Sequence, residues 1–434
     1  MFVQRCINCE SEFGLDERMY VCSRCGDLLD IERSEPLGQS VEDLRSLWLE
    51  RLKSREARDR SGVWRFRELL PFGPEDAIVS LGEGNTPLYD APRSADYCGI
   101  TSLKLKHQGN NPTSSFKDTG MTVAVTQALK LGMRLVACAS TGNTAASLAA
   151  YAARARMLCA ILVPEGQVSD AKLAQALDYG AKVLEIEGNF DVCMRVIQEL
   201  AEQSSLYLVN SINPFRIEGQ KTVAFELAEQ LEWQVPDHLV VPGGNLGNSS
   251  ALGKGFRELF SHGFTRKQPR ISVIQAEDAA PFARFFSGNG EGEFINESHP
   301  RTLATAIKIG APVSWRKAWR AVRETGGQVI TVSEQEIADA KAMIGRDGVG
   351  CEPASATTVA GIRKLVSDGA IGKDESVVAV LTGHVLKDTD YVIKYHNQTL
   401  VTEHGERIRG TFANSIMRVA ARPCAIENAL KGLS

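Results

Sequence analysis

From about residue 100 onward, short apolar runs alternate with longer stretches in which apolar residues recur at helical spacing. The apolar runs have the length of buried strands, and the stretches between them have the length of helices. The predicted strands are 134–139, 159–164, 182–186 and 206–209, and the predicted helices are 118–131, 143–155, 170–179 and 190–203. Because strand and helix alternate at this spacing, we expect these strands to be parallel neighbours in one sheet.

A second set of apolar runs follows in the carboxy-terminal half of the chain. Its predicted strands are 238–242, 271–275, 328–332 and 377–382, with helices at 221–231 and 333–344. The pattern therefore predicts an α/β fold with two open parallel-sheet lobes. In such folds ligands bind at the carboxyl ends of the strands and in the cleft between lobes. We therefore expect the catalytic and binding residues directly after the strands.

The region before residue 100 lacks this alternation. Residues 41–59 carry an approximate helical stripe made by Val41, Leu44, Leu47, Leu49 and Leu52. Residues 61–88 are broken repeatedly by glycine and proline, which predicts loop and short turns.

Four of the ten cysteines form two C-x-x-C pairs with twelve residues between the pairs: Cys6 and Cys9, then Cys22 and Cys25. Each pair makes a tight turn that aims two thiolates at one point, and four thiolates complete the tetrahedral shell of a structural Zn²⁺. Gly26 can adopt the left-handed conformation that the second turn needs. The alternatives are two redox dithiols or a decayed ribbon without metal. The other cysteines are scattered, as free thiols of a reducing compartment would be.

These patterns divide the chain into four segments. They are a zinc ribbon (1–30), a linker helix with the first part of the large lobe (31–112), a small α/β lobe (113–213), and the rest of the large lobe with a carboxy-terminal extension (214–434). A chain of 434 residues has room for two or three domains.

Composition and charge narrow the class of protein. The chain is 43% hydrophobic and 24% charged with a net charge of −4, which is ordinary globular composition and does not favour a nucleic-acid surface. The amino terminus lacks a signal-peptide pattern, and Arg154 and Arg156 interrupt the most apolar stretch. We therefore expect a soluble cytoplasmic protein with neither a membrane nor a nucleic-acid partner.

Two polar stretches of the first lobe carry candidate chemistry. Lys117 lies near a predicted helix start, where the positive end of the helix dipole helps to keep an amine neutral and nucleophilic; the alternative is a solvated lysine. Ser140, Thr141 and Asn143 directly follow strand 134–139 and open a helix, an arrangement that suits a carboxylate; the alternative is a simple helix cap.

Two further stretches follow strands of the second lobe. Residues 242–250 open a helix with three glycines, so that backbone N–H groups can cradle a phosphate; the alternative is a structural turn. Thr382 ends a strand and can present its hydroxyl to the same cleft; the alternative is an ordinary strand-terminal threonine. A lysine, a polar amide, a phosphate cradle and a hydroxyl together are what a pyridoxal 5′-phosphate site needs.

At these residues the sequence resembles the fold-type II pyridoxal-phosphate enzymes, and within them the threonine synthases, some of which carry an amino-terminal ribbon. The segments that carry the resemblance are 62–71, 82–88, 110–118, 140–147, 213–222, 242–248, 302–314 and 382–388. The resemblance implies that Lys117 forms the imine with the cofactor and shuttles protons. It implies Asn143 at the ring hydroxyl and Thr382 at the ring nitrogen, and it places around the cofactor phosphate Gly243, Gly244, Asn245, Leu246 and Gly247.

The same resemblance implies conversion of O-phospho-L-homoserine and water to L-threonine and phosphate, by a homodimer. Ser140 and Thr141 would hold the substrate carboxylate, and Lys106 and Arg216 are candidates for its phosphate. The alternative for Arg216 is an ion pair at the surface or between lobes. Gln108 and Thr119 depart from the common family pattern, which puts substrate detail in doubt but not the cofactor.

Three other functions remain open at the level of the sequence. Two use the same cofactor: a cysteate or cysteine synthase acting on O-phosphoserine, and a threonine dehydratase. The third is a catalytically dead protein that uses its ribbon to bind a partner. The intact Lys117 and glycine loop argue against the third, and the candidate phosphate ligands argue against the dehydratase.

Overall fold

The computed structural model describes residues 1–434 except 167–169, 189, 204, 415 and 432–434. Its smaller sheet has four parallel strands in the order β8-β7-β6-β9. The strands are β6 (Leu135–Ala139), β7 (Leu158–Pro164), β8 (Lys182–Ile186) and β9 (Leu206–Leu208), and the helices of this part are α3 (Lys117–Lys130), α4 (Asn143–Arg154), α5 (Asp170–Asp178) and α6 (Phe190–Gln203). The predicted parallel order of strand and helix is confirmed here.

The larger sheet has six strands in the order β12-β11-β10-β13-β5-β4. All neighbours are parallel except β4 and β5, which are antiparallel. The strands are β4 (Leu88–Asp90), β5 (Leu103–His107), β10 (His238–Pro242), β11 (Arg270–Ala276), β12 (Val329–Val332) and β13 (Val377–Leu381). The four predicted strands are confirmed, and β4 and β5 are additions that the pattern did not show.

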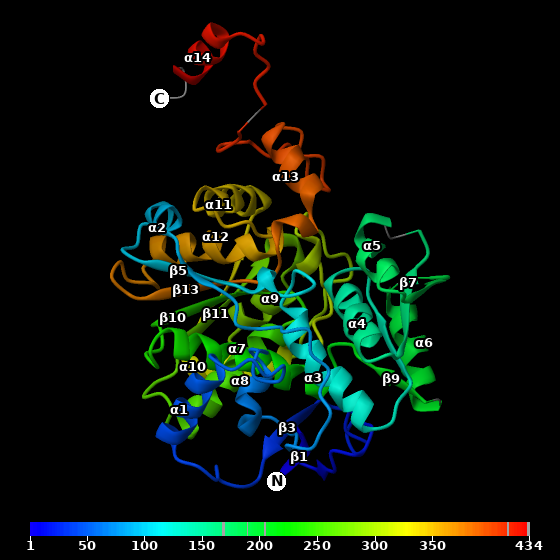
Figure 1. Cartoon of the computed structure of the whole chain (residues 1–434). Coiled ribbons are helices and arrows are strands. Elements are labelled where there is room, and N and C mark those ends of the chain that lie inside the picture. Colours follow the sequence, from blue (N-terminus) through cyan, green and yellow to red (C-terminus); the bar gives the residue numbers. More distant parts are fainter. Residues whose placement is uncertain (167–169, 189, 204, 415, 432–434) are drawn as a thin grey trace.

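Helices surround this sheet and join the two parts. They are α2 (Pro92–Cys98), α7 (Pro214–Gln230), α8 (Gly247–Ser261), α9 (Pro281–Ser287), α10 (Trp315–Thr325), α11 (Glu334–Arg346) and α12 (Pro353–Ser367). Short 3-10 turns are η1 (Trp64–Leu69), η2 (Gln108–Asn110), η3 (Glu277–Ala279), η4 (Thr305–Ile307) and η5 (Val385–Lys387). Helix α7 packs against both α3 and α8 and is buried along nearly its whole length, so it forms the contact between the two sheets' layers (Figure 1).

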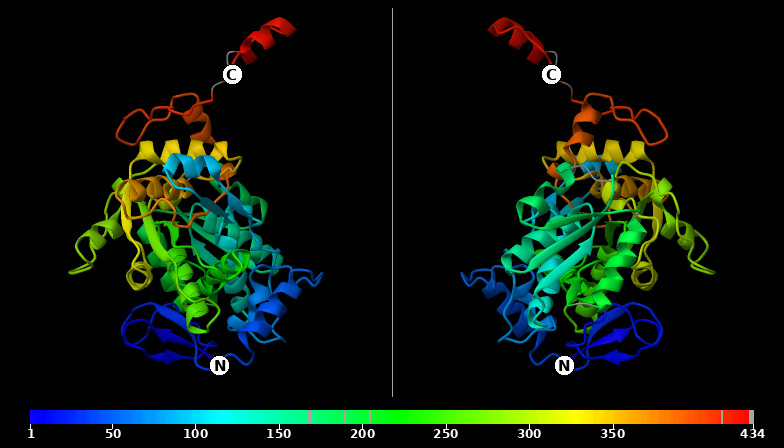
Figure 2. Two further views of the ribbon diagram at one scale, coloured as in Figure 1. Left: turned by 90° about the vertical axis from the view of Figure 1, so that its left-hand side faces the viewer. Right: turned by 90° about the vertical axis from the view of Figure 1, so that its right-hand side faces the viewer.

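The amino-terminal segment forms a separate antiparallel sheet in the order β2-β1-β3. Its strands are β1 (Phe2–Cys6), β2 (Glu12–Phe13) and β3 (Leu29–Arg33). Figure 2 shows this ribbon at one end of the molecule and the carboxy-terminal helices α13 (Thr389–His396) and α14 (Pro423–Lys431) at the other. Helix α14 stands away from the body in every view.

The predicted helical stripe of residues 41–59 is wrong in its length and in part of its buried face. Helix α1 (Val41–Arg51) ends eight residues earlier and buries Leu44 and Trp48. Leu49 is exposed because it lies beside the face that carries Leu44 and Trp48. Leu52 continues the spacing of four residues but is exposed because the helix ends at Arg51. Among the described residues, no helix combines the length and the apolar character that crossing a bilayer requires.

Candidate active site

Lys117 is the first residue of α3, and the loop before it is fastened to the segment that follows β13. The Phe116 N–H donates to the Thr382 carbonyl over 2.9 Å, and the His384 N–H donates to the Ser114 carbonyl over 3.0 Å. These two hydrogen bonds bring Thr382 beside Lys117, although 265 residues separate them in the sequence. The predicted meeting of the lysine and the strand-end threonine is therefore observed.

Asp118 holds the same loop from its other side. Its buried carboxylate accepts hydrogen bonds from the Thr113 N–H and the Thr113 hydroxyl, both at 2.6 Å, and from the Ser147 hydroxyl at 2.5 Å. Burial raises the pKa of this carboxyl to about 6, although these three donors oppose the rise. The loop that carries Lys117 is thus tied both to α4 and to the end of β13.

The surroundings of Lys117 favour its neutral amine. Burial lowers the pKa of Lys117 to about 7, the positive charge of Arg216 lowers it further, and the Glu352 carboxylate acts in the opposite direction. Its Nζ atom lies 4.3 Å from the centroid of the Phe116 ring. The sequence suggested the helix dipole as the activating influence, whereas in the structure burial is the largest one. A lysine with a pKa near neutrality can act as a nucleophile and as a proton carrier.

Asn143 and Thr382 are brought together by Glu352, a residue that the sequence analysis missed. Asn143 Nδ2 donates to one carboxylate oxygen of Glu352, and the Thr382 hydroxyl donates to the other, both over 3.1 Å. The Ser355 hydroxyl lies 3.1 Å from that of Thr382. Burial raises the pKa of Glu352, because desolvation disfavours its charged form. The missed signal was a single acidic residue in an otherwise small and apolar stretch, 349–362.

The glycine loop lies between β10 and α8 and leaves the start of α8 open. Leu246 has a left-handed backbone (φ 62°), and α8 has no side-chain cap. A Cβ placed on Gly247 would meet no atom closer than 3.8 Å, so the packing of the chain itself does not require glycine there. Both amide atoms of the buried Asn248 lack a hydrogen-bond partner within the described residues. Free N–H groups at a helix start and an unpartnered amide fit a phosphate group.

Gly243 and Asn245 fix the conformation of this loop through their contacts with the rest of the chain. A Cβ on Gly243 would lie 2.7 Å from the Gln275 side chain, so glycine is needed there for packing. Asn245 Nδ2 donates to the Ser211 hydroxyl, and its Oδ1 accepts from the Val313 N–H, both over 2.7 Å. Asn245 therefore fixes the loop against two distant segments. The remaining predicted residue of the loop is Gly244, and a Cβ placed on it would lie 3.2 Å from Ile307.

The segment after β6 places Ser140 and Thr141 at the start of α4. The residue in the cap position is Gly142, and no side chain caps this helix. The Ser140 hydroxyl accepts a hydrogen bond from the Gly142 N–H over 3.3 Å. Because the alternative of a simple side-chain cap is absent at α4, the N–H groups at its start remain available for an anionic group.

Arg216 is a buried cation without an acidic partner in the described part of the chain. It is 3% exposed, its Nη1 donates to the Val209 carbonyl over 3.4 Å, and its Nε has no partner. Burial lowers the pKa of Arg216 to about 10. Helices α3 and α7 cross closely at Gly120, where an added Cβ would lie 2.7 Å from the Arg216 carbonyl oxygen. This close crossing brings Arg216 near Lys117. Within the described residues Arg216 forms neither a surface ion pair nor one between lobes.

The surroundings of Lys106 differ from the substrate-facing position that the sequence suggested. It is fully buried on β5, where its Nζ forms an ion pair with Glu226 and donates to the Thr86 carbonyl over 2.7 Å and to Gln230 Oε1 over 2.8 Å. An ammonium group has three N–H donors, and these three acceptors use all of them. The structure therefore argues against Lys106 as a ligand of the substrate phosphate.

The four amino-terminal cysteines form a second candidate site, remote in the fold from Lys117. All four Sγ atoms lie within 4.8 Å of one another, with Cys6 and Cys25 at 3.4 Å and Cys9 and Cys22 at 3.6 Å. In a tetrahedral site with Zn–S bonds of about 2.3 Å, the sulfurs lie about 3.8 Å apart. Gly26 has the left-handed backbone expected of it (φ 74°). The cluster can therefore hold a metal ion.

Comparison with known proteins relates this geometry to a family. Residues 79–383 match the family model described as "Pyridoxal-phosphate dependent enzyme". The chain is 46% identical to a threonine synthase of Methanocaldococcus jannaschii over 92% of this chain and 96% of that protein. It is 47% identical to a threonine synthase of Methanosarcina acetivorans over 93% and 96%, and 46% identical to one of Mycobacterium tuberculosis over 76% and 89%.

Solved structures of lower sequence identity share the fold. A threonine deaminase of Solanum lycopersicum is 20% identical with a TM-score of 0.60, over 81% of this chain and 86% of that one. An L-serine ammonia-lyase of Rhizomucor miehei is 18% identical with a TM-score of 0.63, over 75% and 100%. At these identities the likeness concerns the fold alone.

Proposed function

The chain belongs to the family of pyridoxal-phosphate-dependent enzymes, and from that premise we propose that it is a threonine synthase. The proposed reaction converts O-phospho-L-homoserine and water into L-threonine and phosphate. Its relatives carry that name at 46–47% identity over almost the whole chain. The observation that carries the proposal is Arg216, a buried guanidinium without a carboxylate partner in the described chain, beside a lysine with a lowered pKa. Such a cation fits a substrate that brings its own anionic group.

The residues at the site fit the cofactor. Lys117 would form the covalent link to it, and the free N–H groups at the start of α8 would hold its phosphate with Asn248. Asn143 would contact the ring hydroxyl, and Thr382 would contact the ring nitrogen. When bound, pyridoxal phosphate supplies an electron sink for negative charge at the substrate's α-carbon.

The other steps fall to the side chains of the chain itself. Once released from the cofactor, the Lys117 amine can remove the proton at the α-carbon and then move protons at the β-carbon. Ser140, Thr141 and the open start of α4 would hold the substrate carboxylate. Arg216 would grip the phosphate that departs from the γ-carbon, because a guanidinium can bind two phosphate oxygens at once.

The experiment that tests this proposal measures two products from two substrates. Purified enzyme loaded with pyridoxal phosphate is given O-phospho-L-homoserine or O-phospho-L-serine, and both phosphate and the amino-acid product are quantified. Threonine and phosphate formed in equal amounts from phosphohomoserine are expected. Turnover of phosphoserine alone would move the function to a cysteate or cysteine synthase, and turnover of neither would leave a protein without this chemistry.

We also propose that the cysteine cluster holds Zn²⁺ and that the metal is structural, because four thiolates leave no open coordination position. Purified protein is expected to contain one zinc per chain by elemental analysis. Cys9→Ala should lose the metal and unfold the ribbon at lower temperature, since binding energy in such sites is folding energy. The matched control is Cys424→Ala, which removes another exposed thiol far along the chain. Full zinc content in the Cys9 variant would contradict the assignment.

The remaining proposals concern the setting in which the enzyme works. Its partner is a small phosphorylated amino acid, and we propose that it acts as a homodimer in the cytoplasm. Buried free thiols such as Cys138, Cys159 and Cys351 suit a reducing compartment.

A further inference from the structure

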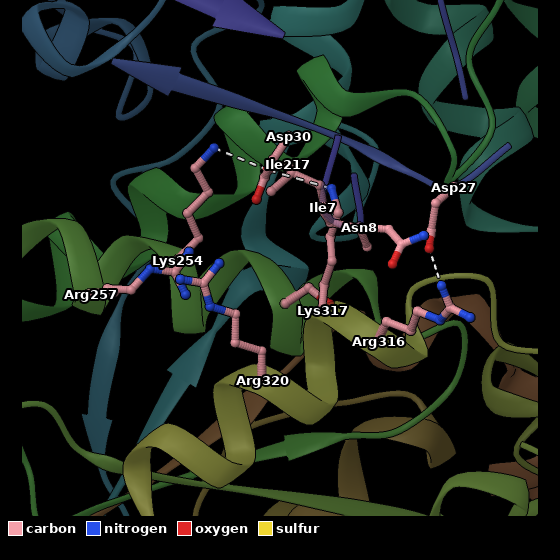
Figure 3. A pocket seen from close by; sticks show the side chains of 11 residues that line it. Ile7, Asn8, Asp27, Asp30, Ile217, Lys254, Arg257, Arg316, Lys317 and Arg320 are labelled. Atoms are coloured by element: carbon pink, nitrogen blue, oxygen red, sulfur yellow. Dashed lines mark hydrogen bonds and ion pairs between the residues drawn. The ribbon is translucent and has the colours of Figure 1, made fainter. Parts of the chain in front are cut away.

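A polar cavity lies where the amino-terminal ribbon meets α8 and α10. Its volume is about 200 Å³. The ribbon side includes Asn8, Asp27 and Asp30, and the opposite side is formed by basic residues (Figure 3). These are Lys254 and Arg257 from α8 and Arg316, Lys317 and Arg320 from α10. Five cationic side chains therefore face two carboxylates.

Both carboxylates are already used to attach the ribbon to the body of the molecule. Asp27 forms an ion pair with Arg316. Asp30 lies 3.1 Å from Lys254 Nζ and 3.4 Å from Lys317 Nζ. Lys254 Nζ also lies 2.5 Å from the carboxylate of Glu218 on α7. These ion pairs give Lys254, Lys317 and Arg316 acidic partners inside the cavity.

In the described part of the chain, Arg257 and Arg320 share a single acidic ion-pair partner, and their side chains are 27% and 51% exposed. Both pair with one carboxylate, that of Glu324, at 3.3 Å from Arg257 Nη1 and 2.8 Å from Arg320 Nε. Within the described residues, the two terminal nitrogens of Arg320 and the Nε and Nη2 atoms of Arg257 have no hydrogen-bond partner. Two guanidinium groups that share one carboxylate and keep further N–H donors can bind a tetrahedral oxyanion.

The neighbouring Lys317 also lines the cavity, and its Nζ donates to the Leu29 carbonyl over 2.6 Å. Its side chain is 9% exposed. Burial lowers the pKa of Lys317, the Asp30 and Glu218 carboxylates oppose this fall, and the nearby Lys254 adds to it, so that the pKa stays below its ordinary value. An anion in the cavity would offset this unfavourable charge.

We propose that this cavity is a binding site for a small anion that carries a phosphate group. The cavity is separate from the proposed catalytic residues, since none of Lys117, Asn143 and Thr382 lines it. Its volume leaves room for a phosphate group and a short organic arm.

The position of the cavity connects it to two other sites. Asn8 lies within the first C-x-x-C turn and Asp27 follows the second, so the cavity needs the ribbon in its folded form. On the opposite side, the segment that leads into α10 holds Asn245 of the glycine loop through the Val313 N–H. An anion bound between the ribbon and α10 would therefore touch the elements that support the proposed cofactor loop.

The test measures the binding of inorganic phosphate to the cofactor-loaded enzyme by calorimetry at constant ionic strength. The starting protein carries Arg216→Gln, so that phosphate at the proposed substrate site does not add to the signal. Adding Arg257→Gln together with Arg320→Gln is expected to raise the phosphate Kd about tenfold or more, since charge-assisted hydrogen bonds are lost. The matched control, Arg323→Gln, changes an exposed arginine of α10 outside the cavity and should leave the Kd within about twofold.

A second measurement uses the unmodified enzyme and is independent of how the variants fold. Crystals of the cofactor-loaded protein are soaked in tungstate, a tetrahedral dianion that anomalous scattering can locate. Tungstate between Arg257 and Arg320 is expected. A phosphate Kd that the double change leaves unaltered, or tungstate found only at the glycine loop and Arg216, would overturn the proposal. Both outcomes can be read whether or not the enzyme makes threonine.

Discussion

Replacing Lys117 with alanine is expected to lower the formation of threonine from O-phospho-L-homoserine by about 10³-fold or more. The amine is the candidate for two roles at once, the link to the cofactor and the transfer of protons, and two other buried or half-buried lysines already have hydrogen-bond partners. Lys106 is held by Glu226, and Lys387 donates to Gln175. The measurement is the initial rate of threonine formation at saturating cofactor.

Lys130→Ala is the matched control for this variant. Lys130 is the last residue of the same helix, is partly exposed and pairs with Asp76 at 2.8 Å, so its loss should leave the rate nearly unchanged. A second readout does not depend on activity: borohydride reduction of the loaded enzyme should fix the cofactor to the peptide that contains Lys117, as mass spectrometry can show. Cofactor fixed at another lysine, or a Lys117 variant that keeps a tenth or more of the rate, would refute the assignment.

The regular part of the fold could be predicted from the sequence because buried parallel strands are uninterrupted apolar runs. That rule located β6, β7, β9 and β10 to β13. The edge strand β8 was also found, although it contains Lys182 and Glu185 and is largely exposed. It failed at β5, where Lys104 and Lys106 break the apolar pattern. Lys106 is buried there only because Glu226, 120 residues away in sequence, supplies its counter-charge. The predicted limits of the four segments, 1–30, 31–112, 113–213 and 214–434, stay predictions.

The candidate site shows a similar division. Lys117, Asn143, Thr382 and the glycine loop could be found because each stands next to the end of a predicted strand or at the start of a helix. Glu352 could not be found in this way, since it opens α12 and its importance lies in contacts with Asn143 and Thr382. Arg216 differs from the buried helical arginines Arg51 and Arg65 in that those two pair with Glu68 and Glu229, whereas Arg216 has no acidic partner within the described residues. A sequence gives the type of a side chain and its local setting, whereas the charges that surround it depend on the packing of distant segments.

Arg216→Gln is expected to lower kcat/KM for O-phospho-L-homoserine by about a hundredfold, which corresponds to roughly 3 kcal/mol. Glutamine keeps much of the length of the side chain and can still donate to the Val209 carbonyl, but it has neither the charge nor the second donor for a phosphate. Most of the loss should fall on KM, and inhibition by inorganic phosphate should weaken by a similar factor. Arg154→Gln, an exposed change on α4, is the control and should leave both constants within about twofold.

The same variant should change the pH dependence of cofactor loading. In the unmodified protein freed of cofactor, the rate of loading should rise with pH through about 7, because only the neutral Lys117 amine attacks the cofactor aldehyde. Burial lowers the pKa of Lys117 most, and the positive charge of Arg216 lowers it further by disfavouring a second cation nearby. Removing that charge must raise the pKa of Lys117, so the rise in loading rate should move to higher pH in the Arg216 variant. An unchanged midpoint together with an unchanged KM would show that Arg216 is neither close enough to act on Lys117 nor a ligand of the substrate phosphate.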